Sequence, residues 1–160
     1  MKDPWRVWGV FAILVVVHFF LHLGLGLGPE APDLLTVALL VAAREVSMGS
    51  AAGMGFVLGL LEDAFSVLAF GGNALAMTVV GVVGARTRDL FVGDSMVFVV
   101  SYLFLGKWVR DLIHWMVAMD GIPQSFTQAV LVQATLAAVY ATAVGIVAVI
   151  ATGTRWDPER

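Results

Sequence analysis

The ionisable side chains whose spacing is most informative lie between residues 107 and 114. Four polar residues there stand at positions i, i+3, i+4 and i+7, which places them on one face of a helix. They are Lys107, Arg110, Asp111 and His114. The surrounding segment is largely apolar, and three charges facing hydrocarbon near the centre of a bilayer would cost about 8 to 10 kcal/mol. We therefore expect this face to point into the protein, where Lys107 pairs with Asp111 and Arg110 bonds a carboxylate or carbonyl oxygen elsewhere.

Two histidines form a second polar feature, in the first apolar segment of the chain. His18 and His22 are one helical turn apart, and we place them at a membrane depth similar to that of Arg110 to His114. We predict a polar layer that joins the first and fifth apolar segments, with Asp111 bonded to one of the histidines. The alternative is that both histidines bond backbone carbonyl groups or lie near the outer headgroups.

The sequence contains no pattern typical of catalysis or of metal binding. The segment HFFLH has Phe19 where the H-E-x-x-H motif requires its glutamate base, and neither a G-x-S-x-G elbow nor a phosphate-binding glycine loop is present. The adjacent Glu62 and Asp63 would point about 100° apart on a helix. With zero cysteines as well, we expect no catalytic residues, no metal and no cofactor, and so no enzyme. A net charge of -3 without a basic run argues against nucleic acid as a partner.

Composition indicates that these residues are carried by membrane helices. Of the 160 residues, 60% are hydrophobic and 13% are charged, whereas soluble domains are about 45 to 50% apolar. At about 20 residues for each span, the length fits six short transmembrane helices in a single domain. We predict an all-α integral membrane bundle, with residues 62–70 as an interfacial or re-entrant connection. The predicted spans are about 7–27, 32–43, 47–61, 71–85, 95–119 and 127–152.

The distribution of basic residues predicts the orientation of this bundle. Cytoplasmic loops of membrane proteins carry an excess of Lys and Arg. An inside N-terminus and six spans leave the outer loops without a basic residue, so we predict a multi-pass protein with both termini in the cytoplasm. The cytoplasmic segments then contain Lys2, Arg6, Arg44, Arg86, Arg88, Arg155 and Arg160.

Small residues at four-residue spacing predict where the helices pack, because lipid-embedded helices associate through close backbone contact. The third segment has two such stripes, so we expect it to lie at the centre of the bundle and to touch several neighbours. Packing within the bundle is the main interpretation, and dimerisation with a second copy of the chain is the alternative. The candidate packing residues are Gly49, Gly53, Gly55, Gly59, Gly81 and Gly145.

Residues 32–88 carry a series of short motifs that resembles a known family. The motifs are, in order, Pro32 to Leu35, Arg44, the glycines Gly53, Gly55 and Gly59, then Glu62 to Phe65, Gly72 to Leu75, and Gly81, Gly84 and Arg86. In this order they resemble MreD, the small membrane subunit of the bacterial rod-shape system, or elongasome. The remaining segments are similar to the family mainly in length and hydropathy.

The resemblance implies a noncatalytic scaffold of the bacterial cytoplasmic, or inner, membrane. Such a protein binds the single-span protein MreC. Through MreC it links MreB filaments in the cytoplasm with the glycosyltransferase RodA and a class-B penicillin-binding protein. A partner helix would dock on the small-residue faces and use interhelical hydrogen bonds to polar groups such as those of the fifth segment.

The resemblance also singles out Asp33, Asp63, Asn73 and Arg86 as motif positions. For Asp63 and Asn73 we favour a structural role over partner contact, since an aspartate can cap the next helix and a carboxamide can hold a loop carbonyl. We expect Arg86 to lie beside anionic lipid headgroups, with a filament contact as the alternative.

The family is similar in fold to the substrate-binding subunits of energy-coupling-factor vitamin transporters. That similarity defines an alternative function. A subunit of this kind holds a small solute in an outward-facing pocket and works with a separate ATPase module.

Overall fold

The computed structural model describes residues 4–26, 32–65, 70–87, 96–117 and 125–152. Within these ranges the chain forms six α-helices, two π-helical segments and no strand, so the predicted all-α class is confirmed. Each of the six predicted segments overlaps one α-helix. In chain order the elements are α1 (Pro4–Phe19), η1 (Phe20–Gly24), α2 (Leu34–Ala43), α3 (Met48–Asp63), α4 (Gly72–Thr87), α5 (Met96–Val117), η4 (Thr127–Ala134) and α6 (Thr135–Ala151).

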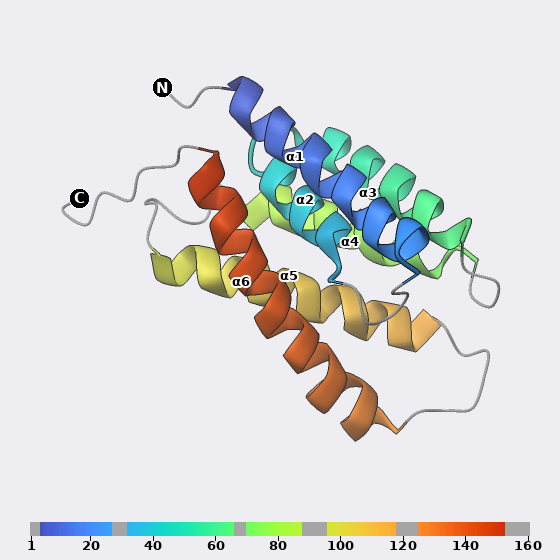
Figure 1. Ribbon diagram of the computed structural model, residues 1–160. Coiled ribbons are helices and arrows are strands. Elements are labelled where there is room, and N and C mark those ends of the chain that lie inside the picture. The colour runs from blue at the N-terminus through green and yellow to red at the C-terminus, as the bar shows by residue number, and fades with distance from the viewer. Residues whose placement is uncertain (1–3, 27–31, 66–69, 88–95, 118–124, 153–160) are drawn as a thin grey trace.

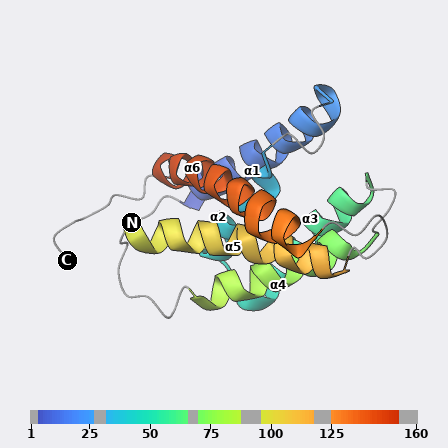
Figure 2. The same cartoon turned by 90° about the horizontal axis from the view of Figure 1, so that it is seen from below.

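Successive helices run in alternating directions through the bundle (Figure 1). The beginnings of α1, α3 and α5 therefore lie at the same end as the last turns of α2, α4 and α6. Seen from below, α1 and α6 lie along one side of the bundle and α4 along the opposite side (Figure 2). We call the end that holds the first turn of α1 the near end, and the other the far end.

The centre of the bundle is α2, the shortest of the six helices. All ten of its residues are buried, and it packs against all five of the other α-helices. The prediction that the third segment is central was wrong, because the backbone of α3 comes close only to those of α2 and α4 among the described elements. The physical reason is that α2 is almost entirely apolar and is covered on every side, whereas α3 leaves Phe56 and Val57 exposed on an outer face.

Helices α3 and α4 form the most extensive contact of the bundle, and glycine makes it possible. A Cβ atom on Gly55 would overlap the backbone carbonyl of Met77, and one on Gly59 would overlap the backbone of Ala74. A Cβ atom on Gly81 would in turn overlap the carbonyl oxygen of Ala51. These three glycines therefore let the two backbones approach directly, as the small-residue spacing predicts.

The remaining candidate packing glycines divide into two groups. Gly145 on α6 faces the side chain of Leu103 on α5, where an added Cβ would lie 2.7 Å from a methyl carbon. Gly49 and Gly53, in contrast, have no heavy atom within 4 Å of an added Cβ. Their predicted role in packing the bundle was wrong, because only the Ala51 side of α3 turns toward α4.

Two helical stretches are long and apolar enough, by length and composition, to cross a membrane. They are Trp5–Gly24 and Thr127–Ala151, among the residues that the structure describes. Helix α5 has 22 residues, but its three charged side chains lower its hydropathy. Helices α3 and α4 have 16 residues each, which is fewer than the roughly 20 of an ideal span.

Candidate functional site

Arg110 on α5 is the centre of a buried polar network toward the far end of the bundle. Its Nη2 atom donates to Glu62 Oε1 on α3 and to Asn73 Oδ1 on α4, both at 2.7 Å. Its Nη1 atom lies 3.3 Å from Asp33 Oδ2, just before α2, and 3.2 Å from Asp111 Oδ1. One guanidinium group therefore bonds to residues of three other segments, which its planar set of five donors allows.

Lys107, one turn earlier on α5, completes the positive half of this network. Its Nζ atom lies 3.0 Å from Asp33 Oδ2 and also contacts Asp111 Oδ1. The predicted pair of Lys107 with Asp111 is therefore present, and Arg110 bonds carboxylates elsewhere in the chain as expected. The side chains of Lys107 and Arg110 are only 6% and 9% exposed, so the ion pairs take the place of the water that these cations have lost.

Asp33 has two structural functions at once. Besides its ion pairs, it is the N-cap of α2, where Oδ1 accepts from the backbone N–H of Thr36 at 3.0 Å and Oδ2 accepts from the Thr36 hydroxyl at 2.6 Å. A side-chain oxygen at this position satisfies a helix N–H group that has no partner within the helix. The start of the central helix is thereby fixed to α5.

Asp63 and Asn73 join α3 to α4 at the same end. Asp63 is fully buried, and its two oxygens accept from the backbone N–H groups of Gly71, Asn73 and Ala74 at 2.9 to 3.1 Å. It caps α4, as predicted. Gly71 has a φ of +96°, a conformation that favours glycine and lets the chain turn back onto this carboxylate. Asn73 bonds Arg110 and not a loop carbonyl as proposed from the sequence.

The histidines are arranged differently from the prediction. Asp111 bonds Lys107 and Arg110 instead of His18 or His22, so the network connects α5 with α2, α3 and α4. The Nδ1 atom of His22 donates to the carbonyl oxygen of His18 at 3.0 Å, so the alternative described above holds for His22, and the two rings stack at 4.0 Å. Among the described residues, Nδ1 of His18 has no hydrogen-bond partner. His18 is 2% exposed. His114 lies next to Gly72, in the first turn of α4.

Glu62 is the network residue that sequence reasoning missed as a site residue. The sequence did contain an indication that Glu62 and Asp63 have different partners, because adjacent residues at the end of a helix point about 100° apart. Asp63 therefore faces the start of α4, while Glu62 faces Arg110. What the sequence lacks is the position of α5 beside α3 and α4, and only that position turns Glu62 into a partner. Arg86 lies apart from the network, in the last turn of α4, with an exposed side chain.

The charges of this network balance almost completely within it. Three carboxylates, those of Asp33, Glu62 and Asp111, surround the two cations Lys107 and Arg110. Within the described residues, the second oxygen of Glu62 and Nε of Arg110 have no hydrogen-bond partner. No group of three or more His, Asp or Glu side chains in these ranges is arranged to hold a metal ion. The arrangement is suited to holding four segments of the chain together. The predicted connection at 62–70 falls in part outside the described residues.

Comparisons with models of protein families, with curated proteins and with solved structures find no significant match for this chain.

Proposed function

We propose that this chain is a noncatalytic scaffold of the bacterial cytoplasmic membrane that binds a single-span partner of the MreC type. In this proposal all six helices cross the bilayer, both termini are cytoplasmic, and the bundle has the fold of the energy-coupling-factor subunits. The wider assembly is the cell-wall elongation complex with MreB, RodA and a class-B penicillin-binding protein. The resemblance of residues 32–88 to MreD supplies the identity of the partners.

The buried ionic network is the observation that carries this proposal. In hydrocarbon, a set of charges is tolerated when its members pair with one another inside the bundle. Arg110 and Lys107 bond Asp33, Glu62, Asp111 and Asn73, so the polar side chains of α5 fasten helices to each other. Because these side chains are already bonded to one another, the network supports a structural scaffold over an enzyme.

The alternation of the helices supports the proposed orientation. Arg6 in the first turn of α1, Arg44 directly after α2 and Arg86 in the last turn of α4 all belong to the near end. Asp33, Glu62 and Asp63 belong to the far end. An excess of arginine at one end is typical of the cytoplasmic side, so the near end is assigned to the cytoplasm.

An outward-facing stripe on α3 supplies a surface for a partner helix. Gly49 and Gly53 are exposed and one turn apart, with open space around an added Cβ. Two helices can approach closely in a membrane where small residues meet. In this proposal the stripe is therefore the place where the transmembrane helix of the partner packs.

Co-purification with the partner tests the proposal. The full chain is expressed with MreC, captured through a tag and analysed by native mass spectrometry in nanodiscs. We expect a complex with the single-span protein that is lost in Gly53→Leu. It should persist in Gly9→Leu, a matched control because Gly9 on α1 is also surrounded by open space.

Each of two outcomes would contradict one part of this proposal. Retention of a saturable small solute without a protein partner would favour the transporter subunit instead. Equal retention of MreC by Gly53→Leu and the wild-type chain would remove α3 as the docking surface.

A further inference from the structure

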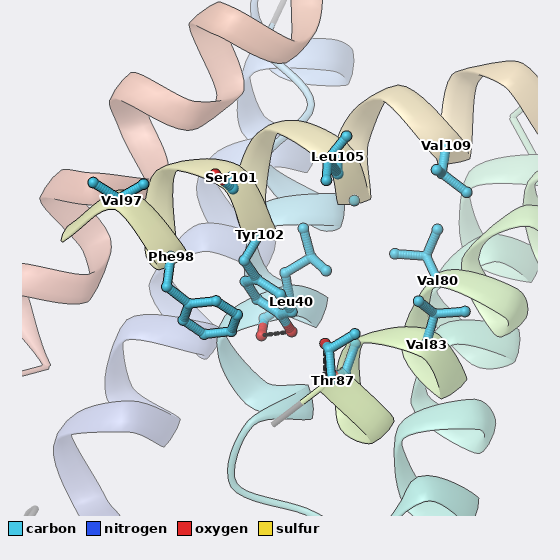
Figure 3. Close-up of a pocket in the computed structure, with 12 residues that line it drawn as sticks. Leu40, Val80, Val83, Thr87, Val97, Phe98, Ser101, Tyr102, Leu105 and Val109 are labelled. Carbon is cyan, nitrogen blue, oxygen red and sulfur yellow. Dashed lines mark hydrogen bonds between the residues drawn. The ribbon is translucent and has the colours of Figure 1, made fainter. Parts of the chain in front are cut away.

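A hydrophobic groove of about 500 Å³ lies between α4 and α5, with Leu40 of α2 at its base (Figure 3). Its volume is within the range of small-ligand sites, about 300 to 1,000 Å³. The walls are mostly aliphatic and include Val80 and Val83 on α4, and Val97, Leu105 and Val109 on α5. This groove is separate from the ionic network.

The hydroxyl groups of two lining residues are bonded within the protein. Tyr102 donates to the carbonyl oxygen of Leu40 at 2.8 Å, and Thr87 donates to the carbonyl oxygen of Gly84 at 3.0 Å. Figure 3 shows both bonds at the base of the groove. Because these two hydroxyl groups already donate hydrogen bonds within the protein, the groove offers a surface suited to hydrocarbon. Water molecules in the groove would have few groups to bond.

The groove is as long as one leaflet of a bilayer. It runs from Val97 to Val109 along α5, a helical length of about 18 Å at about 1.5 Å for each residue. Half of a hydrocarbon core of about 30 Å is about 15 Å. The groove begins at the near end, where α4 ends and α5 starts, so it matches the depth of the cytoplasmic leaflet in the proposed orientation.

Two arginines flank the near end of the groove. The Arg44 guanidinium lies over the ring of Phe98, a lining residue, at 5.7 Å from Cζ to the ring centroid. Arg86 precedes the lining residue Thr87 and is exposed. Basic residues between helices on the cytoplasmic side suit anionic lipid headgroups. The arginines therefore match the headgroup of a phospholipid, and the apolar walls match its acyl chain.

We propose that this groove binds one acyl chain of an anionic phospholipid of the cytoplasmic leaflet, with its headgroup held at Arg44 and Arg86. The inference rests on the membrane orientation proposed above and does not require the MreC partner. A transmembrane helix fits less well, because it is about 10 Å across and about 30 Å long, whereas the groove covers one leaflet.

Native mass spectrometry with defined lipids tests the occupant. The purified, delipidated chain is mixed with equal amounts of phosphatidylglycerol and phosphatidylethanolamine that have identical acyl chains. We expect one phosphatidylglycerol to be retained in preference. Arg86→Gln and Arg44→Gln should each reduce that preference by about fivefold, the factor that corresponds to one basic residue at an anionic surface. Arg6→Gln, at the same end of the bundle, is the matched control and should leave it unchanged.

Filling the groove tests the position of the chain. Ser101 lines the groove and Val100 does not, although both are exposed on α5. We expect Ser101→Phe to release the lipid and Val100→Phe to retain it. Equal loss in both variants, or equal retention of the two phospholipids by the wild-type chain, would overturn the proposal.

Crosslinking in native membranes separates a lipid from a protein occupant. A photoreactive benzophenone side chain in place of Val83 should form adducts with phospholipid, and adducts with another protein chain would overturn the inference. The MreC pull-down with the same variants keeps the two proposals apart. Loss of phosphatidylglycerol with MreC retained supports a lipid site separate from the scaffold surface. Failure of the wild-type chain to retain MreC while it still binds phosphatidylglycerol contradicts the scaffold alone.

Discussion

Arg110 connects parts of the chain that are far apart in the sequence. Its partners Glu62 and Asn73 are 48 and 37 residues away, and Asp33 lies still further toward the N-terminus. Each partner comes from the far end of a different segment, so the guanidinium fixes the relative positions of α2, α3 and α4. A charge in this position stabilises the fold only while all of its partners are in place.

Removing this side chain should therefore destabilise the bundle strongly. Among the described residues, Arg110→Met leaves Asp33, Glu62 and Asp111 with Lys107 as their only nearby cation. Breaking a buried ion pair from one side typically costs about 3 to 5 kcal/mol. The change is measured as thermal unfolding of the purified chain in detergent. Arg86→Met, which removes an exposed arginine, should change stability by less than about 0.5 kcal/mol, and similar losses in the two variants would contradict the role of Arg110.

The adjacent residues Glu62 and Asp63 should differ in how strongly they respond to the same chemical change. Asp63→Asn replaces one carboxylate oxygen with an NH₂ group that faces backbone N–H donors, and an unsatisfied buried group costs about 1 to 3 kcal/mol. Glu62→Gln keeps an oxygen for Arg110 and brings the network to equal numbers of carboxylates and cations. We expect a clear loss of stability for Asp63→Asn and little or none for Glu62→Gln in the same unfolding assay. A larger loss for Glu62→Gln would show that its second oxygen has an essential partner.

At the scale of elements, the sequence predicts the helices better than it predicts their neighbours. Apolar segments separated by short polar stretches predict all six helices. The position of Asp63 before α4 predicts its capping role. The face of α3 that packs on α4 is harder to predict, because small residues form two stripes on this helix. One stripe runs through Ala51, Gly55 and Gly59, and the other through Gly49 and Gly53. Spacing alone cannot decide which stripe meets α4, since that depends on contacts formed only when the whole bundle is assembled.

Substitutions on the two stripes should separate their functions. Gly59→Ala places a methyl group against the backbone of Ala74, so α3 and α4 must move apart, and overpacking of this kind costs about 1 to 3 kcal/mol. Gly53→Ala meets open space and should leave stability within about 0.5 kcal/mol of the wild-type chain. Unfolding in detergent, with α-helical circular dichroism as the readout, measures both. Equal effects would contradict the direct backbone contact of α3 with α4.

At the scale of the whole molecule, α4 and α5 are joined at one end and separated at the other. Arg110 bonds Asn73 at the far end, while the apolar groove lies between the two helices toward the near end. The ionic network joins the helices where their buried charges would otherwise be unpaired. The groove leaves an apolar surface between them that is about as long as half of a bilayer's hydrocarbon core.

The proposed orientation makes a prediction that needs no other partner. Since the chain contains zero cysteines, a single introduced cysteine is the only thiol that can react. Glu45 lies in the exposed turn between α2 and α3, and Ser125 lies just before η4, so they belong to opposite ends of the bundle. In intact spheroplasts, a membrane-impermeant maleimide should label Ser125→Cys and leave Glu45→Cys unlabelled until the membrane is permeabilised. Labelling of Glu45→Cys in sealed spheroplasts would reverse the orientation, and labelling of both variants would mean that the two ends are not separated by a bilayer.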